Sequence, residues 1–214
     1  REVEAPTWRG ASIRSYARWF MASNPLGSIT VPVPWNEVRA SHVEAAVDDL
    51  LARAQQRLDA IHDAPRTYDA TLGALDMATS ELDYAMNVAS HLESVDGSPE
   101  MREAYNKILP KVSAFGSQIM LSEPLYRAMR DLAEADEASK YDPGRARFLK
   151  KTLADFRRNG AELDVKGKER MGASDVALSE QTLKFAQNVV DATAAFELLI
   201  DDEMRQTARR EHRD

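Results

Sequence analysis

The sequence predicts an all-α protein, a bundle of about six long, mostly antiparallel helices with a short irregular N-terminal arm. Apolar residues recur at intervals of three and four along most of the chain, which is typical of helices that bury one face. Proline, glycine and N-capping residues separate these periodic stretches. Alternation with period two is confined to residues 29–33, where prolines weaken the case for a strand.

The composition is that of a globular protein and excludes several classes of site. The 214 residues can build one substantial core, and they are 43% hydrophobic and 29% charged. The absence of cysteine excludes disulfides, thiolate zinc sites and cysteine nucleophiles. A net charge of −7 argues against a nucleic-acid partner, and no apolar run reaches the length of a membrane span. We expect a cytoplasmic protein, with which the lack of cysteine is compatible.

Residues 1–23 form a basic and aromatic N-terminal arm. Its basic and aromatic residues are Arg1, Arg9, Arg14, Arg18, Trp8, Tyr16, Trp19 and Phe20. Such a segment can contact a membrane surface or an acidic partner. We interpret it as an arm that packs its aromatic side chains on the body, which we expect to span residues 24–203.

The first predicted helix follows an irregular stretch. Pro25, Gly27, Pro32 and Pro34 predict extended, irregular chain over 24–35. A helix should then run from about residue 41 to 62 and end at 63–65. Its apolar stripe is Val43, Val47, Leu50, Ala54, Leu58 and Ile61.

The next two helices are predicted over 69–93 and from Pro99 onward. The first has the near-heptad run Leu72, Leu75, Thr79, Leu82, Met86 and Ala89. Ser98 should cap the second, with Pro99 at its first position. Its stripe is Met101, Tyr105, Ile108, Val112, Phe115 and Ile119. Pro110 predicts a kink within it.

Three further helices follow. Ser122-Glu123-Pro124 begins one that has Leu125, Met129 and Leu132 on its apolar face. The next is bounded by the cap Asp142-Pro143 and by Asn159-Gly160, a left-handed exit. The last, of about 25 residues or more, is predicted to bury a single stripe, and Gly167 and Gly172 should loosen its start. That stripe is Leu178, Thr182, Phe185, Val189, Phe196 and Ile200.

Histidine is too sparse to build a recognisable metal centre. The four histidines are His42, His62, His91 and His212, and no two are four residues apart. Asp59 lies three positions before His62, which is the pair most similar to the Glu-x-x-His motif of a di-iron site. We interpret these two residues as a solvated helix end. We interpret His91 as a packed or capping residue. The sequence therefore predicts no catalytic, cofactor-binding or metal-binding residue, and no cofactor, in this chain.

Charge clusters give weaker signals. Glu44, Asp48 and Asp49 could meet a peptide N-terminus or a divalent ion, but a solvated outer face is the simpler interpretation. The acidic run 201–203 is interpreted in the same way. Arg157-Arg158 could hold a carboxylate or a phosphate of a ligand. We favour the other interpretation, in which the pair complements the helix dipole or forms a structural salt bridge. No phosphate-binding glycine loop or Gly-x-Ser-x-Gly elbow is present. The basic tail 204–214 could be a frayed helix end, added residues, or sequence read out of frame after a truncation.

Several stretches resemble one family of enzymes. They are DFRRNGAEL (155–163) and LKFAQNVVDAT (183–193), preceded by NPL (24–26), PWNEVRASHVEAA (34–46), HLESV (91–95) and REAYN (102–106). In order and spacing they are similar to the N-terminal region of the thimet oligopeptidase and oligopeptidase A family. The resemblance covers roughly residues 24–203. It departs from the family at Asp164-Val165, where a proline is common.

The resemblance implies a zinc metallopeptidase that cuts short peptides. In that family, H-E-x-x-H binds the metal, and this motif does not occur in the 214 residues. We therefore expect the helical wall of a substrate channel, inactive by itself, whose zinc belongs to a missing catalytic domain. Its partners would be short peptides and that domain. We expect it neither to bind nucleic acid nor to span a membrane. The alternative is a stand-alone helical module that binds peptides or self-associates. A third possibility is an enzyme of unrecognised type, which would need titratable groups clustered in a pocket.

Overall fold

The structure, a computed structural model, describes residues 24–96 and 98–197. All regular secondary structure in these ranges is helical, which confirms the all-α prediction. The long helices are α2 (Ala40–His62), α4 (Ser80–Asp96), α5 (Pro99–Leu121), α6 (Glu123–Glu134), α7 (Pro143–Arg158) and α8 (Val165–Ala194). Two compact units divide within α8, after Ala177. The predicted arm 1–23, the acidic run 201–203 and the tail 204–214 lie outside the described residues.

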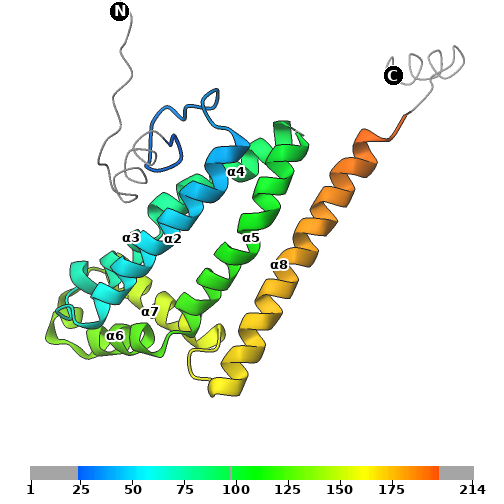
Figure 1. Ribbon diagram of the computed structural model, residues 1–214. Coiled ribbons are helices and arrows are strands. Elements are labelled where there is room, and N and C mark those ends of the chain that lie inside the picture. The colour runs from blue at the N-terminus through cyan, green and yellow to red at the C-terminus, as the bar shows by residue number, and fades with distance from the viewer. Residues whose placement is uncertain (1–23, 97, 198–214) are drawn as a thin grey trace, which may run out of the picture. The chain divides into compact units, whose positions relative to one another are not determined.

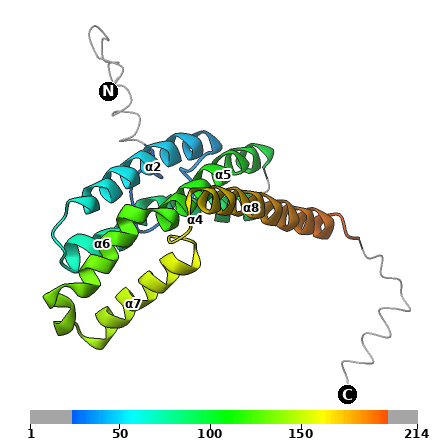
Figure 2. The same ribbon diagram turned by 90° about the horizontal axis from the view of Figure 1, so that it is seen from below.

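Helix α2 is the centre of the first unit. It packs against α3 (Ala74–Ala78), α4, α5 and α6. Its whole predicted stripe is buried, from Val43 to Ile61. Helices α2 and α5 run in the same direction, and α4 runs antiparallel to both (Figure 1). Helices α6 and α7 pack side by side at one edge of this unit (Figure 2).

The chain enters α2 through an irregular segment, as predicted for residues 24–35. Asn24 is buried and fixes this segment twice. Its Nδ2 donates to the carbonyl oxygen of His42 (2.9 Å), and its Oδ1 accepts from the backbone N–H of Leu26 (3.0 Å). The side chain of Leu26 is fully buried in the core. The entry segment is therefore anchored to the first turn of α2.

The helix predicted over 69–93 is interrupted, and this corrects the sequence prediction. A π-helix, η1 (Asp69–Gly73), leads into α3, and Thr79 separates α3 from α4. The hydroxyl of Thr79 lies 2.9 Å from Asp83 Oδ2, and that of Ser80 donates to the carbonyl oxygen of Met77 (3.0 Å). Such local bonds compete with helix continuation, and a π turn shifts the register of the residues after it. The buried apolar positions are accordingly Leu72, Ala78, Leu82, Ala85, Val88 and Ala89, whereas Leu75, Thr79 and Met86 are half-buried.

The predicted caps of α5, α6 and α7 are present. Ser98 Oγ accepts from the N–H of Met101, and Ser122 Oγ accepts from the N–H of Leu125. Asp142 Oδ1 accepts from the N–H groups of Gly144 (2.8 Å) and Arg145 (3.1 Å). Helix α5 is assigned continuously through Pro110, while the kink predicted there stays a prediction.

Helix α8 is as long as predicted but differs in its burial. It begins at Val165, where Asp164 Oδ1 accepts from the N–H of Gly167 (2.7 Å) and caps the first turn. The loosening expected from Gly167 and Gly172 stays a prediction. The stripe predicted to be buried is exposed: Leu178, Phe185 and Phe196 expose 67%, 71% and 72% of their surface. Thr182 and Val189 are exposed as well, and Ile200 lies outside the described residues. The periodicity correctly identified an apolar face but not whether anything covers it.

Candidate functional site

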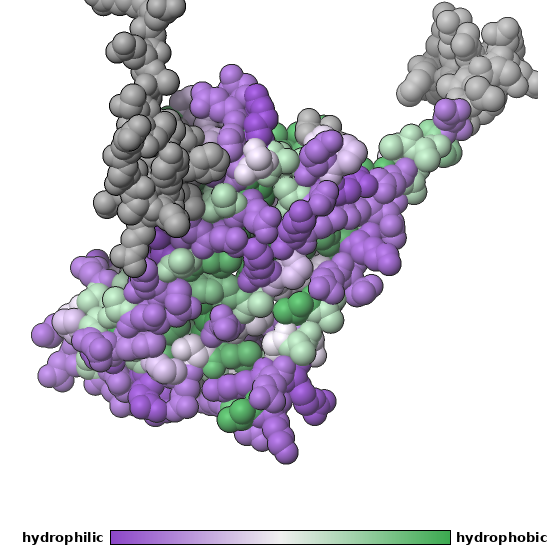
Figure 3. Space-filling model, in the orientation of Figure 1, coloured by the Kyte–Doolittle hydropathy of each residue, from purple (hydrophilic) through white to green (hydrophobic). Residues whose placement is uncertain are grey.

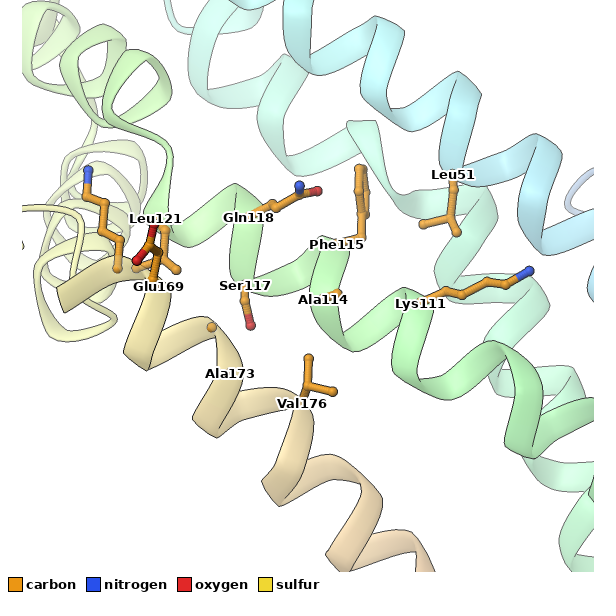
Figure 4. A pocket seen from close by; sticks show the side chains of 12 residues that line it. Leu51, Lys111, Ala114, Phe115, Ser117, Gln118, Leu121, Glu169, Ala173 and Val176 are labelled. Carbon is orange, nitrogen blue, oxygen red and sulfur yellow. The ribbon is translucent and has the colours of Figure 1, made fainter. Parts of the chain in front are cut away.

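An apolar groove lies between α5 and the first turns of α8. It has a volume of about 850 Å³ and lies within the first unit. Its apolar walls are formed by Leu51 of α2, by Ala114, Phe115 and Leu121 of α5, and by Gly172, Ala173 and Val176 of α8. Figure 4 shows Ser117 on α5 and Val176 on α8 directed toward the space between the two helices. Hydrophilic residues cover most of the face seen in Figure 3, with hydrophobic residues appearing between the helices.

Small residues and one hydrogen bond set the width of the groove. Ala114, Gly172 and Ala173 provide almost no side chain between α5 and α8. Ser117 Oγ lies 2.8 Å from Asp175 Oδ2 and ties the helices together beside the groove. Because these two residues are 58 positions apart, helical periodicity alone did not predict their contact. The run of small residues in both helices is the sequence signal that could have indicated a close approach.

Polar groups gather at the end of the groove nearest α2. Lys111 Nζ contacts Asp48 Oδ1 (2.8 Å) and Glu44 Oε1 (3.2 Å). Hydrogen bonds from the ammonium to these carboxylates raise the pKa of Lys111 above its ordinary value of 10.5, although desolvation opposes the rise. Two members of the predicted acidic patch therefore hold α5 against α2. The third, Asp49, pairs with Arg53 on its own helix (3.4 Å).

The start of α8 is positioned by the turn that follows α7. Gly160 has φ +93°, and the N–H of Ala161 donates to the carbonyl oxygen of Phe156 (2.9 Å), closing a left-handed helix end. Tyr126 of α6 donates to Glu162 Oε1 (2.6 Å) and accepts from Arg157 Nε (2.8 Å). The hydrogen bond from Tyr126 and the charge of Arg157 lower the pKa of the Glu162 carboxyl below its ordinary value of 4.5.

The predicted arginine pair has the structural role favoured from the sequence. Arg157 lies 3.4 Å from Glu162, and Arg158 lies 2.6 Å from Asp155. Phe156 beside them is completely buried. The contact of Arg157 with Tyr126 could not be predicted from helical periodicity, because it joins two helices.

The histidines are dispersed in the part of the chain that the structure describes. His42 Nδ1 accepts from the N–H of Arg39 at the start of α2 (3.1 Å), and His91 packs against Trp35 with ring centroids 4.9 Å apart. His62 ends α2, while Asp59 accepts from Gln55 Nε2 (2.7 Å). Over residues 24–96 and 98–197, no three His, Asp or Glu side chains gather closely enough to hold a metal ion. None of the helices in these ranges is long and apolar enough to cross a membrane.

Comparisons with known proteins match most of the chain to one family. The family model described as Neurolysin/Thimet oligopeptidase, N-terminal domain, matches residues 47–169, more than half of the chain. Oligopeptidase A of Salmonella typhimurium is 33% identical over 184 residues, which are 85% of this chain and 27% of that protein. Oligopeptidase A of Escherichia coli is 30% identical over 183 residues, with the same coverage, and an organellar oligopeptidase A of Arabidopsis thaliana is 27% identical over 183 residues, 85% of this chain and 23% of that protein. The chain thus spans about a quarter of the length of these relatives. Through its N-terminal domain, it belongs to the neurolysin/thimet oligopeptidase family.

Proposed function

We propose that this chain acts as the N-terminal helical region of a zinc metallo-oligopeptidase that hydrolyses short peptides. In this proposal it forms part of the wall of the substrate channel and is not catalytic by itself. The match of residues 47–169 to the family's N-terminal domain is the observation that carries the proposal. The zinc would be bound by residues outside the 214, in a protein that works in the cytoplasm.

The groove between α5 and α8 supports a role in contacting peptides. Its apolar walls suit the side chains of an unfolded peptide, and Ser117 offers a hydroxyl beside them. The ammonium of Lys111 is already paired with Glu44 and Asp48 and is not available to a peptide carboxylate, so we expect the groove to favour apolar side chains.

Hydrolysis by the purified chain tests the catalytic part of the proposal. A quenched fluorescent peptide is incubated with the chain, with zinc added and with a chelator. We expect no cleavage above the buffer rate, because the 214 residues have no H-E-x-x-H motif. Cleavage by the chain alone that a chelator abolishes would overturn this part.

A filled groove tests the peptide-contacting part. Ala173 is exposed and lines the groove, whereas Ala177, one turn further along α8, is exposed and does not line it. We expect Ala173→Trp to weaken binding of a labelled short peptide rich in leucine and phenylalanine, and Ala177→Trp to leave it unchanged. Fluorescence anisotropy measures the affinity, and circular dichroism checks that both variants fold. Equal affinities of the two variants, or no binding by the unaltered chain, would refute the assignment of the groove.

The exposed face of α8 favours a second candidate, a helical module that associates through apolar contacts. Leu178, Phe185, Val189 and Val190 are all about half exposed or more. Sedimentation velocity over a range of concentrations tests this candidate. Association that rises with concentration and is weakened by Phe185→Ser would support it, whereas a monomer at every concentration would refute self-association.

A further inference from the structure

Helix α7 concentrates positive charge in a chain whose net charge is −7. Its 16 residues include six arginines and lysines and a single acidic residue, Asp155. Three of the six basic residues are engaged within the fold. Arg145 lies over the ring of Tyr68 (4.5 Å to the centroid), and Arg157 and Arg158 form the contacts described above.

The other three basic residues, Arg147, Lys150 and Lys151, form the α7 basic stripe. All three are exposed, and no side-chain hydrogen bond or ion pair joins them to another residue of the described ranges. Their spacing of three and four places them on one face of the helix. Leu149 and Phe156 are buried on the other side of α7 and fix this helix to the body. The stripe is therefore held in place before any partner binds.

The stripe is unfavourable for the isolated fold. Like charges three and four residues apart repel one another and destabilise a helix. Glutamates between them would remove this repulsion, yet Asp155, which pairs with Arg158, is the helix's sole acidic residue. An anionic partner would relieve the repulsion and gain several charge-assisted contacts at once.

We propose that the α7 basic stripe binds a short acidic segment of a polypeptide. From Arg147 to Lys151 the stripe is about 6 Å long, given the rise of an α-helix. An extended peptide rises about 3.3 Å per residue, so two or three consecutive residues match this length. A nucleic acid continues far beyond the stripe and meets the negative charge of the rest of the chain, which disfavours it as the partner. The inference does not depend on the proposed peptidase function.

A matched pair of triple variants tests the proposal. The first combines Arg147→Gln, Lys150→Gln and Lys151→Gln. The control combines Lys166→Gln, Arg170→Gln and Lys184→Gln, which are exposed basic residues of α8. Each variant loses three positive charges, so the two have the same net charge. The probe is a fluorescein-labelled peptide with three consecutive glutamates between neutral serines, measured by anisotropy at about 0.05 M and about 0.2 M salt, over which range screening increases.

The expected result is specific to the stripe. The unaltered chain should bind this peptide, and the stripe variant should bind it about tenfold more weakly at low salt, since exposed ion pairs each contribute modestly. The control variant should stay within about twofold of the unaltered chain, as expected where no contact is removed. Equal weakening in both variants, or no binding by the unaltered chain, would overturn the proposal. It would also be overturned if a short DNA duplex bound more tightly than the peptide and lost this binding in the stripe variant.

Discussion

Gly160 is the position at which a single methyl group should disturb the turn that leads into α8. Its φ of +93° lies in a region that residues with a Cβ rarely adopt. A Cβ built there would lie 2.6 Å from Leu163 Cδ1 and 3.3 Å from Leu121 Cδ2. Leu163 is 45% exposed and can rotate away, whereas Leu121 is half-buried and must shift. The strain of the backbone therefore dominates the effect of Gly160→Ala.

The size of the stability loss expected for Gly160→Ala follows from that strain. A left-handed conformation destabilises a residue with a Cβ by about 1–2 kcal/mol relative to glycine. The expected loss in the free energy of unfolding is at least about 1 kcal/mol. For a chain of this size, each kcal/mol lost lowers Tm by about 2–4 °C.

Gly172→Ala is the matched control for this prediction. Gly172 lies within α8, and its Cβ would meet only Leu121 Cδ1 at 3.8 Å, an ordinary contact. Alanine is favoured over glycine inside a helix by about 1 kcal/mol, so this variant should be as stable as the unaltered chain or more stable. Urea denaturation followed by circular dichroism at neutral pH measures both. If the two variants lose the same stability, the left-handed turn at Gly160 is not what fixes the start of α8.

Two further predictions concern the same region. Phe156→Ala should reduce the free energy of unfolding by about 3–5 kcal/mol, because the side chain is fully buried; a loss below about 1 kcal/mol in urea denaturation would contradict its place in the core. Glu162→Gln should lower Tm at neutral pH, since the hydrogen bond from Tyr126 and the charge of Arg157 depress the pKa of Glu162 in the folded chain. A depressed folded pKa gives stability that is present above the unfolded value and is lost as pH falls through the folded one. The difference in Tm from the unaltered chain should therefore shrink as pH falls below the ordinary carboxyl value of 4.5, and it should disappear once Glu162 is protonated in the folded chain. A difference that stays constant from pH 7 to strongly acidic solution would refute the role of the carboxylate charge.

The ends of helices could be predicted from the sequence because they depend on local chemistry. Ser98, Ser122 and Asp142 each accept hydrogen bonds from backbone N–H groups within the next three residues, and Gly160 supplies the positive φ of a helix end. The interruption at Thr79 was missed although it also has local causes. The heptad pattern across it suggested one continuous helix, and a π turn leaves no comparable pattern.

The candidate site could not be predicted because it depends on pairs of distant residues. Ser117 meets Asp175, Lys111 meets Glu44 and Asp48, and Tyr126 meets Glu162. Each pair joins segments that tertiary packing brings together: two helices in the first two cases, and α6 with the turn before α8 in the third. The resemblance to oligopeptidases marked residues 155–163 as a characteristic stretch, and the structure supplies the physical reason, since this stretch closes α7 and orients α8.

The contrast between α2 and α8 shows what helical periodicity can decide. Both helices repeat apolar residues at intervals of three and four, and the sequence predicted a buried stripe in each. In α2 every member of the stripe from Val43 to Ile61 is buried, because α3, α4, α5 and α6 cover it. In α8 Phe185 is 71% exposed, although Leu178 and Val189 lie seven and four residues away on the same face. Spacing therefore predicts that a face is apolar, while burial depends on a second surface that the spacing does not identify. The association experiment with Phe185→Ser addresses this second surface directly, because it asks whether another copy of the chain can provide it.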